Sequence, residues 1–402
     1  MRRYACGLLI AALMGCVVQL PPPASAPPLD QSNEPGNKLY RTPNDVHALL
    51  IDEAASDFEQ GHCANVSVRK GLGVVLRTDT LAGKDESLPY QGVYTSRVIA
   101  TEFPFNDVVP SWNVDVSPDD GFVVELRLGR AADGFWTPYY YFGTWGEADA
   151  PPSKIQHDEN GDVDKDYFRS TNRFDRLQYR VRLFAVEGRE RVILRRFAVA
   201  YSNTLNDADL ARRFRRPVDP GPQDKWARRL PVPFRSQKWE ASQVRGSICS
   251  PTSLSMVLEY YGVRLTTRNV YEVVYDPEFR LYGNWPRAVQ TAHVLGVPGY
   301  LERFGDWNAV KRHIAAGRPV IASIRIEKGQ LRNNPERQSN GHLLVITGFD
   351  GSGGVYINDP AGATEEIGIV THPIEDVEKI WFDHGGVGYV LLGAAGPHSV
   401  AP

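Results

Sequence analysis

The sequence predicts an α+β protein, with a jelly-roll-like antiparallel β-sandwich first and a domain of mixed helices and strands after it. Segments of alternating apolar and polar residues, broken by Gly, Pro and Asp, dominate residues 39–205, as is typical of antiparallel sheets. Apolar residues at helical spacing, interleaved with short apolar runs, dominate residues 230–402. A chain of 402 residues is also long for a single core. Residues 206–229, which are basic and contain prolines, are expected to link the two domains.

The first domain is expected to open with a helix over residues 44–60. Val46, Leu50, Ala54 and Phe58 recur there at a spacing near one helical face. Beyond this point the pattern predicts strands in Val66–Arg69, Tyr94–Ala100, Trp112–Val116, Phe122–Leu128, Leu177–Leu183 and Val192–Tyr201.

Eight aromatic residues gather in this domain. They are Trp112, Phe135, Trp136, Tyr139, Tyr140, Tyr141, Phe142 and Trp145. Exposed rings on a sandwich would stack on sugar rings, as in carbohydrate-binding modules, whereas buried rings would fill the core between the sheets. We favour the core interpretation and keep carbohydrate as an alternative ligand of this domain.

The second domain opens with a cysteine where a polar loop becomes a helix. Pro251 suits a first helical turn, and Gly262 ends the apolar helical pattern that follows it. Cys249 therefore lies at a helix N-terminus, where the helix dipole and free backbone N–H groups favour the thiolate, the form that attacks carbonyl carbon. A lone cysteine is more often an inert buried side chain, so the hypothesis needs a base.

A histidine and an aspartate downstream supply that base and its orienting group. His342 begins the apolar run 343–349, which reads as a buried strand. The chain then turns at 350–354 and returns as a second strand that ends at Asp359. Such a hairpin brings Asp359 back toward His342, so that one imidazole nitrogen bonds the carboxylate while the other faces Cys249.

The remaining pattern of this domain alternates helix and strand. Helices are expected over 285–295 and 306–317 and near 374–381, and strands over 320–326 and 388–392. Residues 327–341 form a long polar loop that ends beside His342, and such a loop is a candidate lip of a substrate site. The histidines in or beside the predicted helices, including His372, are expected to have surface or capping roles.

The segment from about 230 to 393 resembles the bacterial peptidase C39-like group of papain-fold cysteine peptidases. Five blocks in one order carry the resemblance: Val232–Gln237, Cys249–Leu254, Gly283–Pro286, Gly341–Val345 and Asn358–Pro360. Ser250 departs from the glycine that many relatives carry after the cysteine. The resemblance implies a papain-like body whose active site lies between the cysteine helix and the histidine sheet.

It also implies the role of each site residue. Cys249 would be the nucleophile, His342 the general base, Asp359 the orienting carboxylate, and a glutamine before the cysteine would donate to the oxyanion. Two glutamines qualify: Gln243 stands six residues before Cys249, a separation familiar from papain-like enzymes, whereas Gln237 lies in the matched Ser-Gln block. We prefer Gln237.

The N-terminus reads as an export signal. A basic start precedes an apolar run too short to span a bilayer, and the run ends in Leu13-Met14-Gly15-Cys16, which resembles the lipobox of bacterial lipoproteins. Residues 1–15 would be removed and Cys16 lipidated, in preference to ordinary cleavage after Ala26. The Pro-rich residues 16–38 would then tether the body to a membrane, in the periplasm, at the outer membrane or at the cell surface.

The composition fits an exported enzyme. The formal net charge of −3 predicts no pull toward nucleic acid. Of the four cysteines, Cys6 would leave with the signal and Cys16 would carry lipid. Cys63 and Cys249 then remain, which is too few for a disulfide framework.

No metal or other cofactor is expected. The acidic segment 158–164 lacks the glycine and the distal glutamate of a calcium loop, and therefore reads as a solvated turn. His62 and Cys63 are too few ligands for a structural zinc site. No Gly-rich phosphate loop of the required length appears.

The function hypothesis is therefore an exported cysteine peptidase that hydrolyses peptide or related amide bonds, including cell-wall peptides, through a thioester on Cys249. Two alternatives remain open. One is a non-catalytic lipoprotein that binds peptide or cell wall. The other is an acyltransferase or transpeptidase, in which an amine replaces water in the second step.

Overall fold

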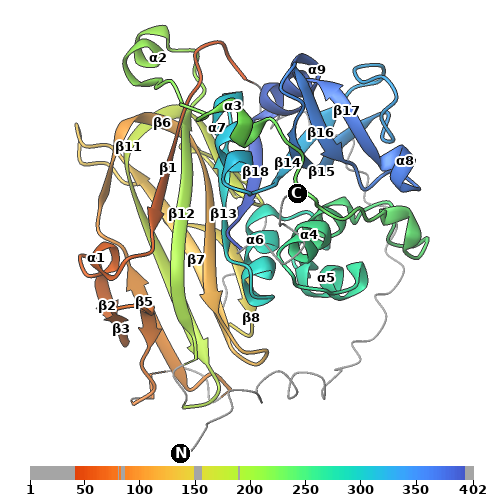
Figure 1. Ribbon diagram of the computed structural model, residues 1–402. Helices are drawn as coiled ribbons and strands as arrows, with labels where there is room; N and C mark the ends of the chain where they lie inside the picture. The colour runs from red at the N-terminus through yellow and green to blue at the C-terminus, as the bar shows by residue number, and fades with distance from the viewer. Residues whose placement is uncertain (1–40, 80, 83–86, 149–155, 189–190, 394–402) are drawn as a thin grey trace, which may run out of the picture. The chain divides into compact units, whose positions relative to one another are not determined.

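Two antiparallel sheets organise this chain in a computed structural model that describes residues 41–393, apart from 80, 83–86, 149–155 and 189–190 (Figure 1). The described residues belong to one compact unit. The predicted signal, the Cys16 lipidation site and the tether lie outside them. None of the described helices is both long enough and apolar enough to span a bilayer.

The N-terminal sheet joins twelve strands among the described residues, and its central order is β2-β5-β11-β6-β12-β4-β3. All of its pairings are antiparallel, as the sequence predicted. The strands are β1 (Val46–Asp52), β2 (His62–Ala64), β3 (Val66–Arg69), β4 (Gly73–Leu76), β5 (Tyr90–Thr95), β6 (Ile99–Asp115), β7 (Gly121–Gly129), β8 (Tyr140–Gly146), β9 (Gln156–Asp158), β10 (Gly161–Asp164), β11 (Tyr167–Ala185) and β12 (Ile193–Asn203).

The long strand β6 carries the chain from one half of this sheet to the other. Its first part pairs with β11 and its second part, from Asp107 on, pairs with β12. The two halves face each other across one core, in which Tyr179 of β11 stacks on Phe197 of β12 with ring centroids 3.7 Å apart. The sheet is therefore sandwich-like, but β6 joins its two layers by hydrogen bonds into one continuous sheet.

The predicted opening helix is wrong. Residues 46–52 form strand β1, which pairs along its whole length with β12, and only the short α1 (Ala55–Phe58) is helical. Val46 packs into the core of the N-terminal sheet, whereas Leu49 and Ile51 on the other face pack against the C-terminal core. Because both faces of β1 contact apolar residues, the strand lacks period-two alternation and resembles a helix in sequence.

The aromatic cluster contributes mainly to packing. Trp112, Tyr140 and Phe142 are buried in the N-terminal core. On the outer face, the guanidinium of Arg127 lies 4.4 Å from the ring centroid of Trp136. Such a cation–π contact covers a face that a sugar ring would otherwise use, which agrees with the core interpretation.

The C-terminal sheet has the order β13-β18-β14-β15-β16-β17, again with antiparallel pairings. Its strands are β13 (Gly299–Arg303), β14 (Val320–Ile326), β15 (Ser339–Phe349), β16 (Gly354–Asn358), β17 (Ile369–Pro373) and β18 (Val387–Leu391). The helices of this part are α4 (Cys249–Tyr260), α5 (Thr267–Val274), α6 (Trp285–Val294), α7 (Trp307–Ala315), α8 (Glu365–Gly368) and α9 (Ile374–Trp381). The predicted elements after residue 249 are thus confirmed, because their periodicity and capping residues agree.

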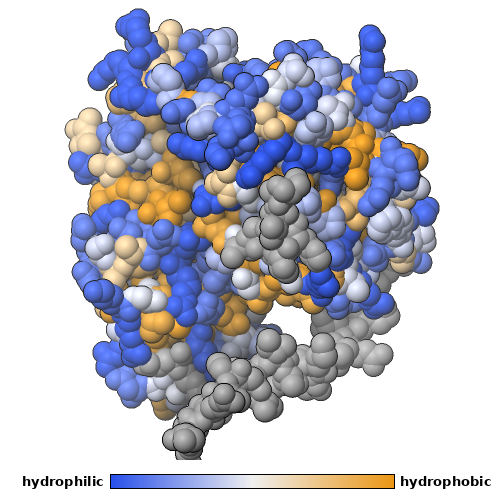
Figure 2. All heavy atoms as spheres, viewed as in Figure 1, coloured by the Kyte–Doolittle hydropathy of each residue, from blue (hydrophilic) through white to orange (hydrophobic). Residues whose placement is uncertain are grey.

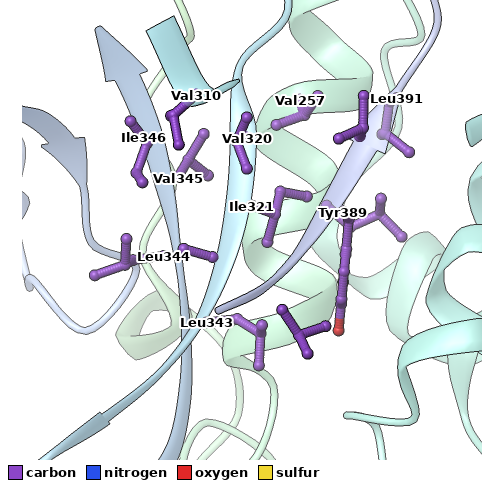
Figure 3. Close-up of a cluster of buried hydrophobic side chains, with 14 of the residues drawn as sticks. Val257, Val310, Val320, Ile321, Leu343, Leu344, Val345, Ile346, Tyr389 and Leu391 are labelled. Atoms are coloured by element: carbon purple, nitrogen blue, oxygen red, sulfur yellow. The ribbon is translucent and has the colours of Figure 1, made fainter. Parts of the chain in front are cut away.

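Helix α4 packs against this sheet through a tightly filled core. Figure 3 shows Val257 of α4 beside Ile321 and Leu391, with Val345 further along the same sheet. All four side chains are fully buried. This packing fixes the distance between the helix that begins at Cys249 and the strand that carries His342.

The linker predicted at 206–229 is partly helical, with α2 (Ala208–Phe214) and α3 (Gln223–Trp226). Asp207 caps α2 by accepting a hydrogen bond from the Leu210 N–H, and Leu210 itself is buried.

On the face drawn in Figure 2, hydrophilic residues cover much of the surface and apolar residues gather in separate areas.

The two sheets contact each other over the outer face of β6 and β12, beside α6 and β13 (Figure 1). Ala198 and Ala200 of β12 belong to the C-terminal core. The Gln290 amide of α6 accepts from the Val114 N–H and donates to the Val114 carbonyl, at 2.9 and 2.7 Å. The two parts therefore share a contact that contains both apolar packing and specific hydrogen bonds.

Candidate active site

Cys249 is the first residue of α4, as the sequence predicted. The residue is half-buried, and its thiol is free. At this position the positive end of the helix dipole and the free backbone N–H groups of the first turn stabilise a negative charge on sulfur. The Ser253 hydroxyl, one turn on, donates to the Leu343 carbonyl at 3.0 Å and ties α4 to the strand beside His342.

The structure brings His342 and Asp359 together. His342 lies in β15 and Asp359 directly follows β16, and the hairpin between these strands pairs Val345 with Asn358. His342 Nε2 lies 2.7 Å from Asp359 Oδ1, and both side chains are buried. A carboxylate at this nitrogen holds the ring in one orientation and stabilises its charged form.

Cys249 completes the set, because its side chain acts on that of His342 and helps to raise the pKa of His342. Nε2 already contacts Asp359, so Nδ1 is the ring nitrogen available to the sulfur. Two elements from different parts of the fold, the N-terminus of α4 and the β15–β16 hairpin, thus supply the three side chains.

The electrostatics of the pair favour an imidazolium beside a carboxylate. Burial lowers the pKa of His342, but the charge and hydrogen bond of Asp359 and the contact with Cys249 raise it well above its usual value. Burial raises the pKa of Asp359, yet the charge and hydrogen bond of His342 and the N–H of Ala361 lower it overall. His342 therefore carries a proton near neutral pH, ready to be donated.

Gln237 and Gln243 have different surroundings. Gln243 is exposed in the turn before α4, whereas Gln237 is 3% exposed. The Gln237 side-chain Nε2 donates to the Arg245 carbonyl, and its backbone N–H donates to the Pro360 carbonyl, each at 2.8 Å. Gln237 thus connects the loop before Cys249 with the residue after Asp359.

The site is open on one side. A Cβ added at Gly246 or Gly341 would meet no atom within 4 Å, so there is room beside the loop before Cys249 and beside His342. Trp239, two residues after Gln237, is 61% exposed, and its indole N–H donates to the Ala363 carbonyl.

Two residues near the site were not predicted. Asn334 donates to Asp359 Oδ2 at 3.2 Å, and His372 contacts Asn334 at 3.2 Å. His372 is 6% exposed rather than at the surface, so the expectation for it is wrong. Both lie outside the matched sequence blocks, and no spacing rule connects the loop after β14 with β17.

Within the described part of the chain, no group of three or more His, Cys, Asp or Glu side chains is arranged to hold a metal ion. The acidic segment near 158–164 forms the β9–β10 hairpin, where Asp158 accepts from the Asn160 N–H. Cys63 is a free, exposed residue of β2.

Comparison with known families identifies both halves of the chain. The profile described as the Peptidase_C39 like family matches residues 229–389, which include Cys249, His342 and Asp359. These residues belong to the peptidase C39-like family. A second profile, described as the Peptidase C39 N-terminal domain, matches residues 50–202, which form the N-terminal sheet. The N-terminal sheet is thus similar to a domain described together with C39 peptidases.

No curated protein sequence matches this chain. Among solved structures, the chain is similar to one described as a double glycine motif protease from an AMS/PCAT transporter in complex with the leader peptide. The identity is 22% and the TM-score 0.30, and the match covers 41% of this chain and 94% of that one.

Proposed function

We propose that this protein is a cysteine peptidase whose nucleophile is Cys249. The observation that carries the proposal is the buried His342–Asp359 hydrogen bond, together with the action of Cys249 at the start of α4 on the His342 ring. In a protein of the peptidase C39-like family, these three side chains have the order and the contacts of a catalytic triad. The substrate is a peptide or a related amide.

The first half of the reaction forms a thioester. The Cys249 thiolate attacks the carbonyl carbon, and the Gln237 amide and backbone N–H groups near the α4 N-terminus stabilise the oxyanion. When the C–N bond breaks, the leaving amine takes the proton held by His342. Asp359 keeps the imidazole ring oriented throughout.

The second half consumes one water molecule. Neutral His342 removes a proton from water while the oxygen attacks the thioester carbon. The C–S bond then breaks, which releases a carboxylate and regenerates the Cys249 thiolate beside a charged His342. The sum of the two halves is hydrolysis of one amide bond.

The test uses residues 39–402, a peptide library and mass spectrometry in water enriched in oxygen-18. We expect cleavage with one heavy oxygen in the new carboxyl terminus, and a loss of about 10³-fold or more in Cys249→Ala and His342→Ala. Cys63→Ser serves as the matched thiol control and retains activity. Products that carry an added amine would instead identify a transferase, and binding without turnover would identify a binding protein.

We also propose that the protein is exported as a lipoprotein anchored through Cys16. The support is the sequence Leu13-Met14-Gly15-Cys16 after a short basic and apolar start. The full chain is expected to incorporate labelled palmitate and to sediment with membranes, whereas Cys16→Ser does neither. If the full chain and the Cys16→Ser variant both stay unlabelled and remain in the membrane-free fraction, this anchor is ruled out.

A further inference from the structure

Every polar atom of the Asn334 amide has a hydrogen-bond partner at the candidate active site. Its Nδ2 donates to Asp359 Oδ2 at 3.2 Å and to the Glu336 carbonyl at 2.7 Å. Its Oδ1 lies 3.2 Å from His372 Nε2. Asn334 is 7% exposed, so these contacts are made away from water and fix the amide in one orientation.

Asn334 comes from the polar loop that the sequence analysis placed beside His342. It lies in residues 327–338, which connect β14 to β15, and not in the hairpin that carries Asp359. The preceding Asn333 is exposed and has a φ of 56°, a left-handed conformation that asparagine tolerates. This turn directs the neighbouring side chain inward, and His372 of β17 meets it from the other side.

The two oxygens of the Asp359 carboxylate have different hydrogen-bond partners. Oδ1 contacts His342 Nε2 and accepts from the Ala361 N–H, at 2.7 and 2.9 Å. Oδ2 accepts from Asn334. Without that donor a buried, charged oxygen loses its partner, and the carboxylate is free to rotate away from His342.

We propose that Asn334 is a positioning residue that holds Asp359 in register with His342. Through it, the position of loop 327–338 decides whether the catalytic base is oriented. His372 supports the same amide from β17. This inference rests on the proposed peptidase function, since it assigns a role within that site.

A purely structural role for Asn334 predicts a different result. A buried asparagine that only fills space affects stability and leaves the titration of His342 unchanged. A positioning residue changes that titration even in a folded variant. The charged or titratable groups that act on His342 are Asp359 and Cys249, and those that act on His372 are Asp359 and Asp376.

The experiment measures two quantities in residues 39–402. One is the midpoint of His342 titration, from NMR of ring-labelled histidine with His342→Ala to assign the signal. The other is the rate of Cys249 alkylation by iodoacetamide against pH, in a Cys63→Ser background. In Asn334→Ala we expect the His342 midpoint to fall by roughly one pH unit. We expect alkylation near neutral pH to slow by about 10–100-fold.

Asn333→Gly is the matched control, because glycine keeps the left-handed turn and the lost side chain is exposed. It should leave both quantities unchanged. A folded Asn334→Ala protein with the wild-type midpoint and alkylation profile overturns the inference. If Asn334→Ala does not fold, His372→Leu replaces it, and an unchanged midpoint in that variant overturns the inference equally.

Failure of the proposed function has a separate signature. In that case the wild-type Cys249 alkylates like an ordinary thiol, with a midpoint near pH ~8.5, and His342→Ala has no effect. An activated wild-type thiol combined with an inert Asn334 would reject only the positioning role.

Discussion

His342 contacts a carboxylate at one ring nitrogen and the Cys249 thiol through the other. The raised pKa of His342 keeps the ring charged as the pH passes its ordinary value of 6.5. His342 is therefore the charged member of the site near neutral pH. Loss of activity is expected in alkaline solution, once His342 releases its proton, and not at pH 7.

The buried carboxyl group of Asp166 has a raised pKa, whereas the pKa of Asp359 is lowered. Asp166 lies between β10 and β11, and its carboxylate accepts from the Trp285 N–H at the start of α6. Burial raises the pKa of Asp166 to about 7, although the Trp285 hydrogen bond opposes this shift. Asp166 is therefore mainly protonated in the folded protein below that pH and mainly ionised in the unfolded chain.

This difference predicts how stability depends on pH. Between about pH 4 and pH 7 the folded state binds the proton that the unfolded chain has lost, so the contribution of Asp166 falls as the pH rises. Asp166→Asn keeps an acceptor for Trp285 and removes the titration. We expect the variant to be less pH-dependent in this window, with a gain on the order of 3 kcal/mol at pH 8.

Urea unfolding of the wild type and Asp166→Asn at pH 5 and pH 8 measures this effect. The exposed Asp119→Asn gives the matched control, because its side chain lies in a turn at the surface. Parallel pH profiles for wild type and Asp166→Asn would show that Asp166 titrates normally.

Helix α6 connects the two sheets. At the first turn of α6, the Asp166 carboxylate accepts a hydrogen bond from the Trp285 N–H. In the middle of the helix Gln290 pairs with Val114, and near its end His293 contacts Asp115 at 2.8 Å. The helix also contacts α4 and α5. The companion sheet therefore determines the position of a helix that packs beside the one beginning at Cys249.

Gln290→Met tests the central contact. The substitution keeps the length of the side chain but leaves the Val114 N–H and carbonyl buried without these partners. Two unpaired backbone groups are expected to lower the free energy of unfolding by about 2–4 kcal/mol in urea titrations. Glu375→Met, on an exposed position of α9, should change it by no more than about 0.5 kcal/mol. Equal effects of the two variants would contradict a specific role for this contact.

At the scale of the whole molecule, the peptidase part depends on the N-terminal sheet. Arg303 of β13 is 5% exposed, and its guanidinium lies 2.7 Å from the fully buried Asp107 of β6. The Leu301 N–H of β13 donates to the Ser111 hydroxyl. Separation of the two parts would break both contacts and expose to water the apolar side chains that β12 shares with the C-terminal core.

We therefore expect residues 230–402 expressed alone not to unfold cooperatively. Residues 39–205 supplied as a separate chain should restore a folded complex, because the contact surface is specific. Co-expression followed by size-exclusion chromatography and circular dichroism measures this. A monomeric, cooperatively folding peptidase fragment would show that the sheet contact is dispensable.

Sequence patterns were enough to predict the helices and strands of the C-terminal half and the three side chains of the candidate site. The α4 helix, the β15–β16 hairpin, and the choice of Cys249, His342 and Asp359 follow from periodicity, capping residues and turn residues, which act over short stretches of chain. The preference for Gln237 over Gln243 came from a matched block and stays a prediction; in the structure Gln237 is buried and Gln243 is exposed.

Other features, namely strand β1 and the contacts of Asn334 and His372, depend on segments that are far apart in the sequence. Residues 46–52 became a strand because β12 pairs with them and apolar residues cover both faces, which removed the alternation that marks most strands. Asn334 contacts Asp359, and His372 contacts Asn334, because three segments that are separate in sequence converge beside one carboxylate. Contacts of this kind leave no periodic trace along the chain, since they depend on how the sheets close on one another rather than on neighbouring residues.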